Sequence, residues 1–342
     1  MAADLEHVER AAVERDLAEG AALAPGGVSP ESEADSAAES AADSAAESEA
    51  ESDTESVAAG DTGSADVHPA RWRTAVRTLV RRPGLVLASV LVFLVVVSAV
   101  FPGLFASADP SATDGVHKLE SPSAQHWFGT DQLGRDLFSR VIHGSGLTME
   151  GTLIAVGLAV GAGLTLGVVA GFFGGWIDAV AMRAIDVVLA IPALLLALTI
   201  VTALGFGTVQ IAFAVGIGIT PGFARTTRAE VLKVKTLPYI EAARTGGAGR
   251  LRVLARHILP NSWGPVLVLA ILDTGTAILV ISSLSFLGFG APPPNADWGG
   301  LISDGRDYLI TSPWLSLLPG MFVVAVVFSV NHISRSIEEL QR

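Results

Sequence analysis

The chain has 342 residues, of which 50% are hydrophobic and only 16% are charged, and its mean hydropathy is +0.52. This composition is unusual for a soluble globular domain. The sequence contains no cysteine, which excludes disulfide scaffolds, thiolate metal sites and cysteine nucleophiles. The formal net charge of −12 is unevenly spread. Residues 1–70 hold 18 of the 34 acidic residues and two of the 22 basic ones, which leaves 20 bases against 16 acids in residues 71–342.

Residues 1–70 predict an acidic, disordered cytoplasmic tail. Positions 29–61 are little more than Ala, Ser, Glu and Asp, and no aromatic residue precedes Trp72. Such a segment buries too little apolar area to offset its ordering entropy. Its negative charge repels nucleic acid and anionic lipid, so we expect no nucleic-acid partner. We expect the tail to solvate the protein in a salty cytoplasm, as in a halophile.

Residues 71–342 predict an all-α integral membrane domain with six transmembrane helices. A span needs about 20 largely apolar residues. The expected spans lie near residues 85–105, 152–172, 185–204, 209–224, 265–287 and 315–332, and the fourth is the weakest because Pro221 and Gly222 interrupt it. Five arginines precede the first span, which predicts that both termini are cytoplasmic. In this orientation 16 Lys and Arg residues from residue 71 onward lie inside and four lie outside.

Glycines recur at four-residue spacing along the second expected span. They are Gly157 and Gly161, followed by Gly163, Gly167 and Gly171. Small residues allow membrane helices to approach closely, so we interpret these glycines as packing positions. Pro192, in the third span, is interpreted as a tolerated kink rather than a gate.

The sequence lacks the motifs of the common enzyme classes. It contains no HExxH, no GxSxG, no GxGxxG after a strand and no GxxxxGK[ST] phosphate loop. We therefore expect no enzymatic activity, no cofactor and no metal in this chain. The seven histidines are scattered and are interpreted as boundary or packing residues.

Asp273 lies within the fifth apolar run. A carboxylate is costly there and usually faces a polar cavity or a partner. Two interpretations stay open. Asp273 lies on a substrate path, or it is hydrogen-bonded to a neighbouring helix.

The long inner loop at residues 237–262 carries the most informative pattern. It reads YIEAARTGG at 239–247 and HILPN at 257–261. These residues predict a charged helix from Leu237, a break at Gly246 and Gly247, and a second helix that ends before Pro260. Taken alone, this is also compatible with a basic loop that only enforces topology.

This loop resembles the cytoplasmic signature of the permease subunits of ATP-binding cassette importers. The signature is EAA, three residues, Gly, nine residues and then I-x-L-P. The positions in register are Glu241, Ala242, Ala243, Gly247, Leu259 and Pro260, and His257 stands where the signature has Ile. The resemblance implies that this loop is a coupling helix that docks in a groove of an ATPase and transmits its closure to the spans.

Other segments resemble the C-type permeases of dipeptide, oligopeptide and nickel importers. They are RRPGLVLASVLVF at 81–93, HWFGTDQLGRD at 126–136, the run that begins GGWIDAV at 174, and LSFLGFG at 284–290. The likeness covers about residues 72–330. Ile281 and the pair Ser334 and Arg335 depart from the family pattern, which puts the substrate contacts in doubt and not the class.

The resemblance implies an all-α, six-helix permease bundle in a prokaryotic cell membrane. It further implies a homologous second permease that completes the pore and two ATPase subunits that hold ATP and Mg²⁺. An extracytoplasmic solute-binding protein would deliver the cargo. The resemblance favours dipeptides or oligopeptides as that cargo, and the sequence alone does not exclude nickel or sugar.

The outer segment with Asp131, Arg135 and Asp136 has two interpretations. It contacts the partner permease or the docked binding protein, or it is a capped turn in which Arg135 is paired locally.

For the whole chain, one alternative is a stand-alone secondary transporter or channel that uses Asp273 as an ion or proton site. A further alternative, an intramembrane enzyme, is not supported because the sequence offers no catalytic pair of residues. Neither alternative explains the spacing from Glu241 to Pro260.

Overall fold

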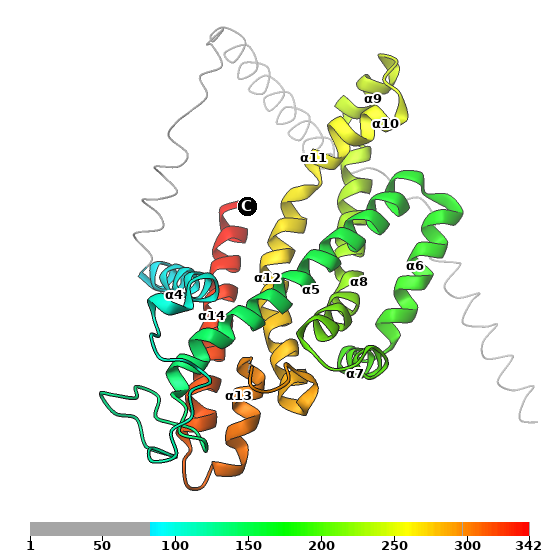
Figure 1. Ribbon diagram of the computed structural model, residues 1–342. Coiled ribbons are helices and arrows are strands. Elements are labelled where there is room, and N and C mark those ends of the chain that lie inside the picture. Colours follow the sequence, from blue (N-terminus) through cyan, green and yellow to red (C-terminus); the bar gives the residue numbers. More distant parts are fainter. Residues whose placement is uncertain (1–82, 296, 342) are drawn as a thin grey trace, which may run out of the picture. The chain divides into compact units, whose positions relative to one another are not determined.

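The computed structural model describes residues 83–295 and 297–341 (Figure 1), and no β-strand occurs in these residues. The fold class is therefore all-α, as predicted. The acidic tail at 1–70 and the five arginines at 71–82 lie outside the described residues.

Four of the described helices are long and apolar enough to cross a membrane. They are α4 (Pro83–Val100), α5 (Leu137–Phe173), α12 (Trp263–Leu284) with its continuation to Phe289, and α14 (Trp314–Gln341). The pair α6 (Gly175–Ala190) and α7 (Ala193–Leu204) provides a fifth if it is counted as one bent span. The helix α8 (Thr208–Lys235) runs through Pro221 without a break and is not among the candidate spans. Its second half is strongly charged.

The third expected span, at 185–204, differs from the prediction. The axes of α6 and α7 are bent by 92° at Ile191 and Pro192, which is a break between two helices and not a tolerated kink. Ile191 is extended because the ring of a following proline disfavours the helical region. Pro192 then starts the new helix as the N-cap of α7. Two ion pairs join α6 to α8, with Arg228 Nη2 2.6 Å from Asp178 Oδ2 and Arg225 Nη2 2.6 Å from Asp186 Oδ1.

The helix α5 begins well before the expected span at 152–172. It starts at Leu137 because the Asp136 side chain caps it and accepts the backbone N–H of Ser139 at 2.7 Å. Its first turns pack against the outer segment at 101–136, and Ser139 and Arg140 of these turns are buried. This helix therefore extends beyond the apolar run from which the span was predicted.

Glycines bring α5 and α8 into close contact. A Cβ atom added at Gly167 would lie 2.5 Å from the Thr227 Cβ, and one added at Gly171 would lie 2.9 Å from the Val231 Cγ1. Gly163 lies equally close to Phe223. Nothing lies within 4 Å of a Cβ at Gly157 or Gly161, which are turned by about 120° and 160° around the helix from Gly163. Packing therefore accounts for the last three glycines and not for the first two.

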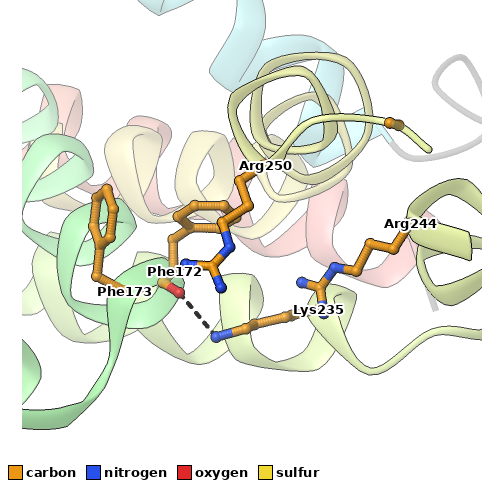
Figure 2. A pocket seen from close by; sticks show the side chains of 6 residues that line it. Phe172, Phe173, Lys235, Arg244 and Arg250 are labelled. Atoms are coloured by element: carbon orange, nitrogen blue, oxygen red, sulfur yellow. Dashed lines mark hydrogen bonds between the residues drawn. The ribbon is translucent and has the colours of Figure 1, made fainter.

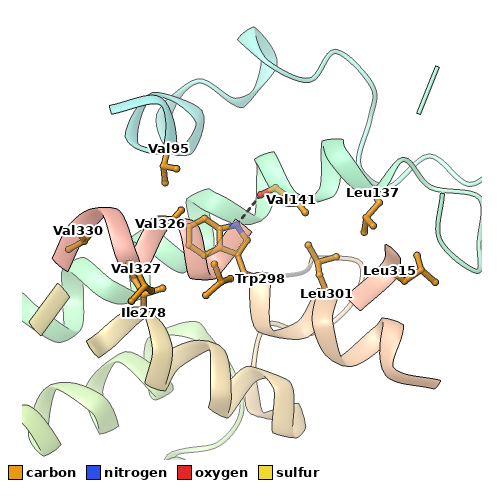
Figure 3. Packing of buried hydrophobic residues seen from close by; sticks show 11 residues of the cluster. Val95, Leu137, Val141, Ile278, Trp298, Leu301, Leu315, Val326, Val327 and Val330 are labelled. Atoms are coloured by element: carbon orange, nitrogen blue, oxygen red, sulfur yellow. Dashed lines mark hydrogen bonds between the residues drawn. The ribbon is translucent and has the colours of Figure 1, made fainter. Parts of the chain in front are cut away.

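The other main core surrounds Trp298 in the short helix α13 (Trp298–Gly305). Trp298 is fully buried, its Nε1 donates a hydrogen bond to the Val141 carbonyl at 3.1 Å, and its ring lies edge-on to Phe322. Figure 3 shows this indole among side chains from four helices, including Val95, Ile278 and Val326. The helices α4, α5, α12 and α14 are thus joined around α13.

Candidate functional site

The inner loop folds as two short helices that are separated by a glycine break. The helix α9 (Pro238–Thr245) carries Glu241, Ala242 and Ala243, and α10 spans Arg250–Val253. Gly247 has a φ of +84°, in the left-handed region that favours glycine, which explains why the break needs this residue. Figure 1 shows α9 and α10 at the opposite end of the helices from α13.

The second helix continues through Pro260, so the expectation that it ends before this residue is wrong. A π-helical turn at Leu254–Ile258 follows α10, and α11 (Leu259–Asn261) continues directly from it. Pro260 lies inside this helical run as the second residue of α11, where it cannot donate a hydrogen bond to the preceding turn. The second half of the loop is therefore helical from Arg250 to Asn261, and α12 begins two residues later, at Trp263.

Two contacts that were not predicted hold the parts of this loop together. Asn261 Nδ2 donates hydrogen bonds to the Tyr239 hydroxyl at 3.1 Å and to the His257 carbonyl at 2.6 Å. The rings of Tyr239 and His257 also meet edge to face, with their centroids 6.4 Å apart. All three residues lie inside the quoted motif, but nothing in their spacing indicates that they touch. His257, the one departure from the signature, therefore has a structural role here.

An apolar cluster connects the loop to the membrane helices. Ile240 of α9 is fully buried, whereas Glu241 and Ala242 on the same helix are exposed. The cluster around Ile240 draws on α5, α8 and the second half of the loop through Phe172, Val231, Val234, Val253 and Ile258. One side of α9, which includes Ala243, therefore packs against the bundle, and the side with Glu241 and Ala242 is open.

Asp273 of α12 is partly buried and has no hydrogen bond or ion pair within residues 83–295 and 297–341. Its carboxylate is therefore not hydrogen-bonded to any of the described helices. Thr276 and Ser283 follow it at three- and ten-residue spacing, and both are exposed. These spacings place the three side chains on one side of the helix.

The outer segment uses its charges internally. Asp131 is 2% exposed, and its Oδ2 accepts hydrogen bonds from Arg135 Nε at 2.6 Å and Arg140 Nη1 at 2.7 Å. Asp136 caps α5 and also binds the His126 ring nitrogen at 2.9 Å. This is the capped turn with a locally paired Arg135. The segment also exposes both apolar and polar groups, with Trp127 65% exposed and Lys118 exposed as well.

The sequence matches a known family and several relatives. Residues 163–341 match the family described as binding-protein-dependent transport system inner membrane component. The dipeptide transport system permease protein DppC of Alkalihalophilus pseudofirmus is 37% identical over 78% of this chain and 88% of its own length. The probable D,D-dipeptide permease DdpC of Escherichia coli is 38% identical over 75% and 87%. The glutathione permease GsiD of Pectobacterium atrosepticum is 36% identical over 76% and 87%.

One solved structure of low similarity is a chain of the inward-facing MetNI methionine ABC transporter, which is 18% identical over 59% of this chain and 96% of that chain, with a TM-score of 0.46. The family match covers the inner loop, α12 and α14, and the relatives extend the similarity over three quarters of the sequence. The matched family is a transport component and not an enzyme family. The chain belongs to the inner-membrane components of binding-protein-dependent transport systems, the permease subunits of ATP-binding cassette importers.

Proposed function

We propose that this permease imports peptides and forms one half of a pore with a homologous second permease. The relatives named above are permeases for a dipeptide, a D,D-dipeptide and glutathione, and these names support a short peptide as cargo over nickel or sugar. Two ATPase subunits that hold ATP and Mg²⁺ bind the inner loop, and an external binding protein delivers the peptide. This chain itself holds no cofactor.

Six spans and cytoplasmic termini complete this proposal. The first half of α8, residues 208–224, is apolar, and its charges begin at Arg225. Counting α8 as the sixth span places the eight bases between Arg225 and Arg256, four of them in the inner loop, on the cytoplasmic side together with both termini. The turn between α5 and α6 then lies on the cytoplasmic side as well, and α13 lies on the outer side.

The observation that carries the coupling role is that α9 exposes Glu241 and Ala242 of the motif while its other side packs against the bundle. Glu241 and Ala242 face solvent, and Ile240 ties the same helix to the ends of α5 and α8. A displacement of α9 by a closing ATPase therefore reaches α5 and α8 directly. Because Gly163, Gly167 and Gly171 interlock these two helices, they move as a unit.

Asp273 is the residue we propose for the substrate path. Its carboxylate has no partner among the described residues, and it shares one side of α12 with exposed hydroxyl groups. A polar strip in a membrane helix is stable where it faces water or another polar surface. The interface with the second permease would provide that surface.

A pull-down tests the coupling role. The full-length tagged chain is purified from mild detergent as the wild type, as the double variant Glu241→Ala, Gly247→Val, and as the control Arg306→Ala, Asp307→Ala. We expect a second permease and the ATPases to co-purify with the wild type and the control, and the ATPases to be lost from the Glu241 and Gly247 variant. A wild-type chain that purifies alone or as a homomer would contradict the proposal.

The cargo needs a separate measurement. ATP-dependent uptake into proteoliposomes that contain the co-purified complex and its binding protein is compared for labelled dipeptides, Ni²⁺ and a disaccharide. Uptake of the dipeptide is expected, and saturable uptake of only one of the other two would overturn the peptide assignment while leaving the coupling role intact.

A further inference from the structure

A basic pocket lies between the C-terminal ends of α5 and α8 and the two helices of the inner loop, α9 and α10. Its volume is about 410 Å³, and its lining consists of Phe172, Phe173, Lys235, Arg244, Ala248 and Arg250. Figure 2 shows the charged ends of Lys235, Arg244 and Arg250 directed toward a common space. No acidic side chain lines this pocket. An anion is therefore the ligand that its charge favours.

The two arginines are free to bind such an anion. Arg244 and Arg250 are exposed, and neither has an ion pair or side-chain hydrogen bond within the described part of the chain. Lys235 is half-buried and donates hydrogen bonds to the carbonyls of Phe172 at 2.8 Å and Gly171 at 3.4 Å. Its ammonium group is therefore held at the C-terminal end of α5. Guanidinium groups match phosphate oxygens with paired N–H donors.

The pocket lies at the level where a membrane meets water. Phe173 ends α5 with 53% of its surface exposed, and Trp176, in the first turn of α6, is 76% exposed. Tryptophan is enriched at membrane interfaces, and basic pockets between membrane helices on the inner side bind anionic headgroups. Phe173 supplies an apolar surface beside the charged groups, where an acyl chain can lie.

We propose that this pocket binds the phosphate group of an anionic phospholipid from the inner leaflet. Arg244 belongs to α9, Arg250 belongs to α10 and Lys235 belongs to α8, so one phosphate bridges three elements. The two arginines stand on opposite sides of the break at Gly246 and Gly247. A bound lipid therefore holds the coupling loop in a fixed geometry against the bundle and makes coupling depend on the lipid composition of the membrane.

The test measures lipid that is retained by the full-length chain with its co-purifying subunits. The complex is reconstituted in nanodiscs of phosphatidylcholine with a small fraction of phosphatidylglycerol, and bound phosphatidylglycerol is measured by native mass spectrometry. The variant Arg244→Gln, Arg250→Gln is compared with Arg252→Gln, Arg256→Gln, which removes the same charge from the same loop but outside the pocket lining. Each basic side chain near the membrane surface raises the affinity for an anionic lipid roughly fivefold. The pocket variant, which lacks two such side chains, should therefore bind phosphatidylglycerol about 30-fold more weakly than the wild type.

The control variant should retain wild-type binding. Equal loss in both variants would mean non-specific attraction of lipid to a basic loop, and would overturn the proposal. The variant Arg244→Lys, Arg250→Lys keeps the charge and loses the paired donors, and it should bind at an intermediate level. The thermal unfolding midpoint of each variant shows whether a loss of bound lipid reflects a loss of folded protein. If the glutamine variant is unfolded, lipid binding by the lysine variant decides between the proposal and its failure.

Two further results would contradict the lipid assignment. If inorganic phosphate, titrated into the lipid-depleted complex in detergent, binds in the wild type and not in the pocket variant, while phosphatidylglycerol retention is the same in both, the ligand is free phosphate. If the pocket variant loses the ATPases and keeps its lipid, the arginines bind a carboxylate of the ATPase. The lipid measurement does not require transport, so its failure is distinct from failure of the importer function.

Discussion

At the residue scale, Gly247 is the position where one side chain should alter function without altering folding. Its φ of +84° strains any β-branched residue, at a cost of about 1–3 kcal/mol, whereas no neighbour lies within 4 Å of an added Cβ. Gly247→Val is therefore expected to insert in the membrane normally and to shift α9 relative to α10. We expect ATP hydrolysis to continue while peptide uptake falls, measured as ATP consumed per peptide imported in proteoliposomes.

Gly249→Val is the matched control for this prediction. Gly249 has a φ of −62° and equally open surroundings, so valine should be tolerated there and the coupling ratio should stay at the wild-type value. Absence of the Gly247 variant from the membrane would show that the glycine is required for folding rather than for coupling.

Single residues also mark what the sequence can and cannot predict. The register from Glu241 to Pro260 is readable because the family signature is local in sequence. Local pairing of Arg135 was one of two open interpretations, because Asp131 lies only four residues away. The contribution of Arg140 was not predicted, because it depends on α5 beginning at Leu137, before the apolar run. The Asn261–Tyr239 bond joins positions 22 residues apart and follows from the folded loop alone.

At the scale of helices, the interface between α5 and α8 makes a prediction about packing. Gly167→Leu places a large side chain where a Cβ alone would meet Thr227 at 2.5 Å, so the helices must separate. Overpacking of this kind costs at least about 1–3 kcal/mol. We expect a clear fall in the thermal unfolding midpoint of the detergent-solubilised protein. Gly157→Leu, on the open face of the same helix, should leave the midpoint unchanged, and equal falls in both variants would contradict this assignment of faces.

Helix boundaries were predicted where hydropathy determines them and missed where polar contacts do. The apolar runs near 265–287 and 315–332 lie within helices of the structure. The first turns of α5 interleave apolar residues with Ser139, Arg140 and His143 and begin at the Asp136 cap, so a search for a continuous apolar run does not detect them. The two prolines behave oppositely. Pro192 separates two helices, whereas Pro221 lies inside a continuous α8 that is packed against α5. A single sequence does not contain the tertiary packing that decides between these outcomes.

At the scale of the whole molecule, Asp273 tests where the pore lies. If its carboxylate faces the path between two permeases, Asp273→Asn should leave membrane level and subunit co-purification unchanged and should lower peptide uptake by about tenfold, which corresponds to roughly 1.4 kcal/mol in the barrier. The measurement is uptake of a labelled dipeptide into proteoliposomes. Asp307→Asn, at a side chain that is 79% exposed, is the control. Normal uptake by the Asp273 variant would remove this residue from the path.

The continuous length of α5 has a mechanical consequence for the whole molecule. Its 37 residues correspond to a rod of about 55 Å, which is longer than the hydrocarbon layer is thick. One end touches the coupling loop through Phe172, and the other begins under Asp136 beside the Asp131 ion network. A rotation of ~5° about the midpoint of such a rod would move its two ends by ~2.4 Å in opposite directions. If α5 turns as one rigid body in this way, a displacement of its Phe172 end is accompanied at its Leu137 end by a displacement of similar size and opposite direction.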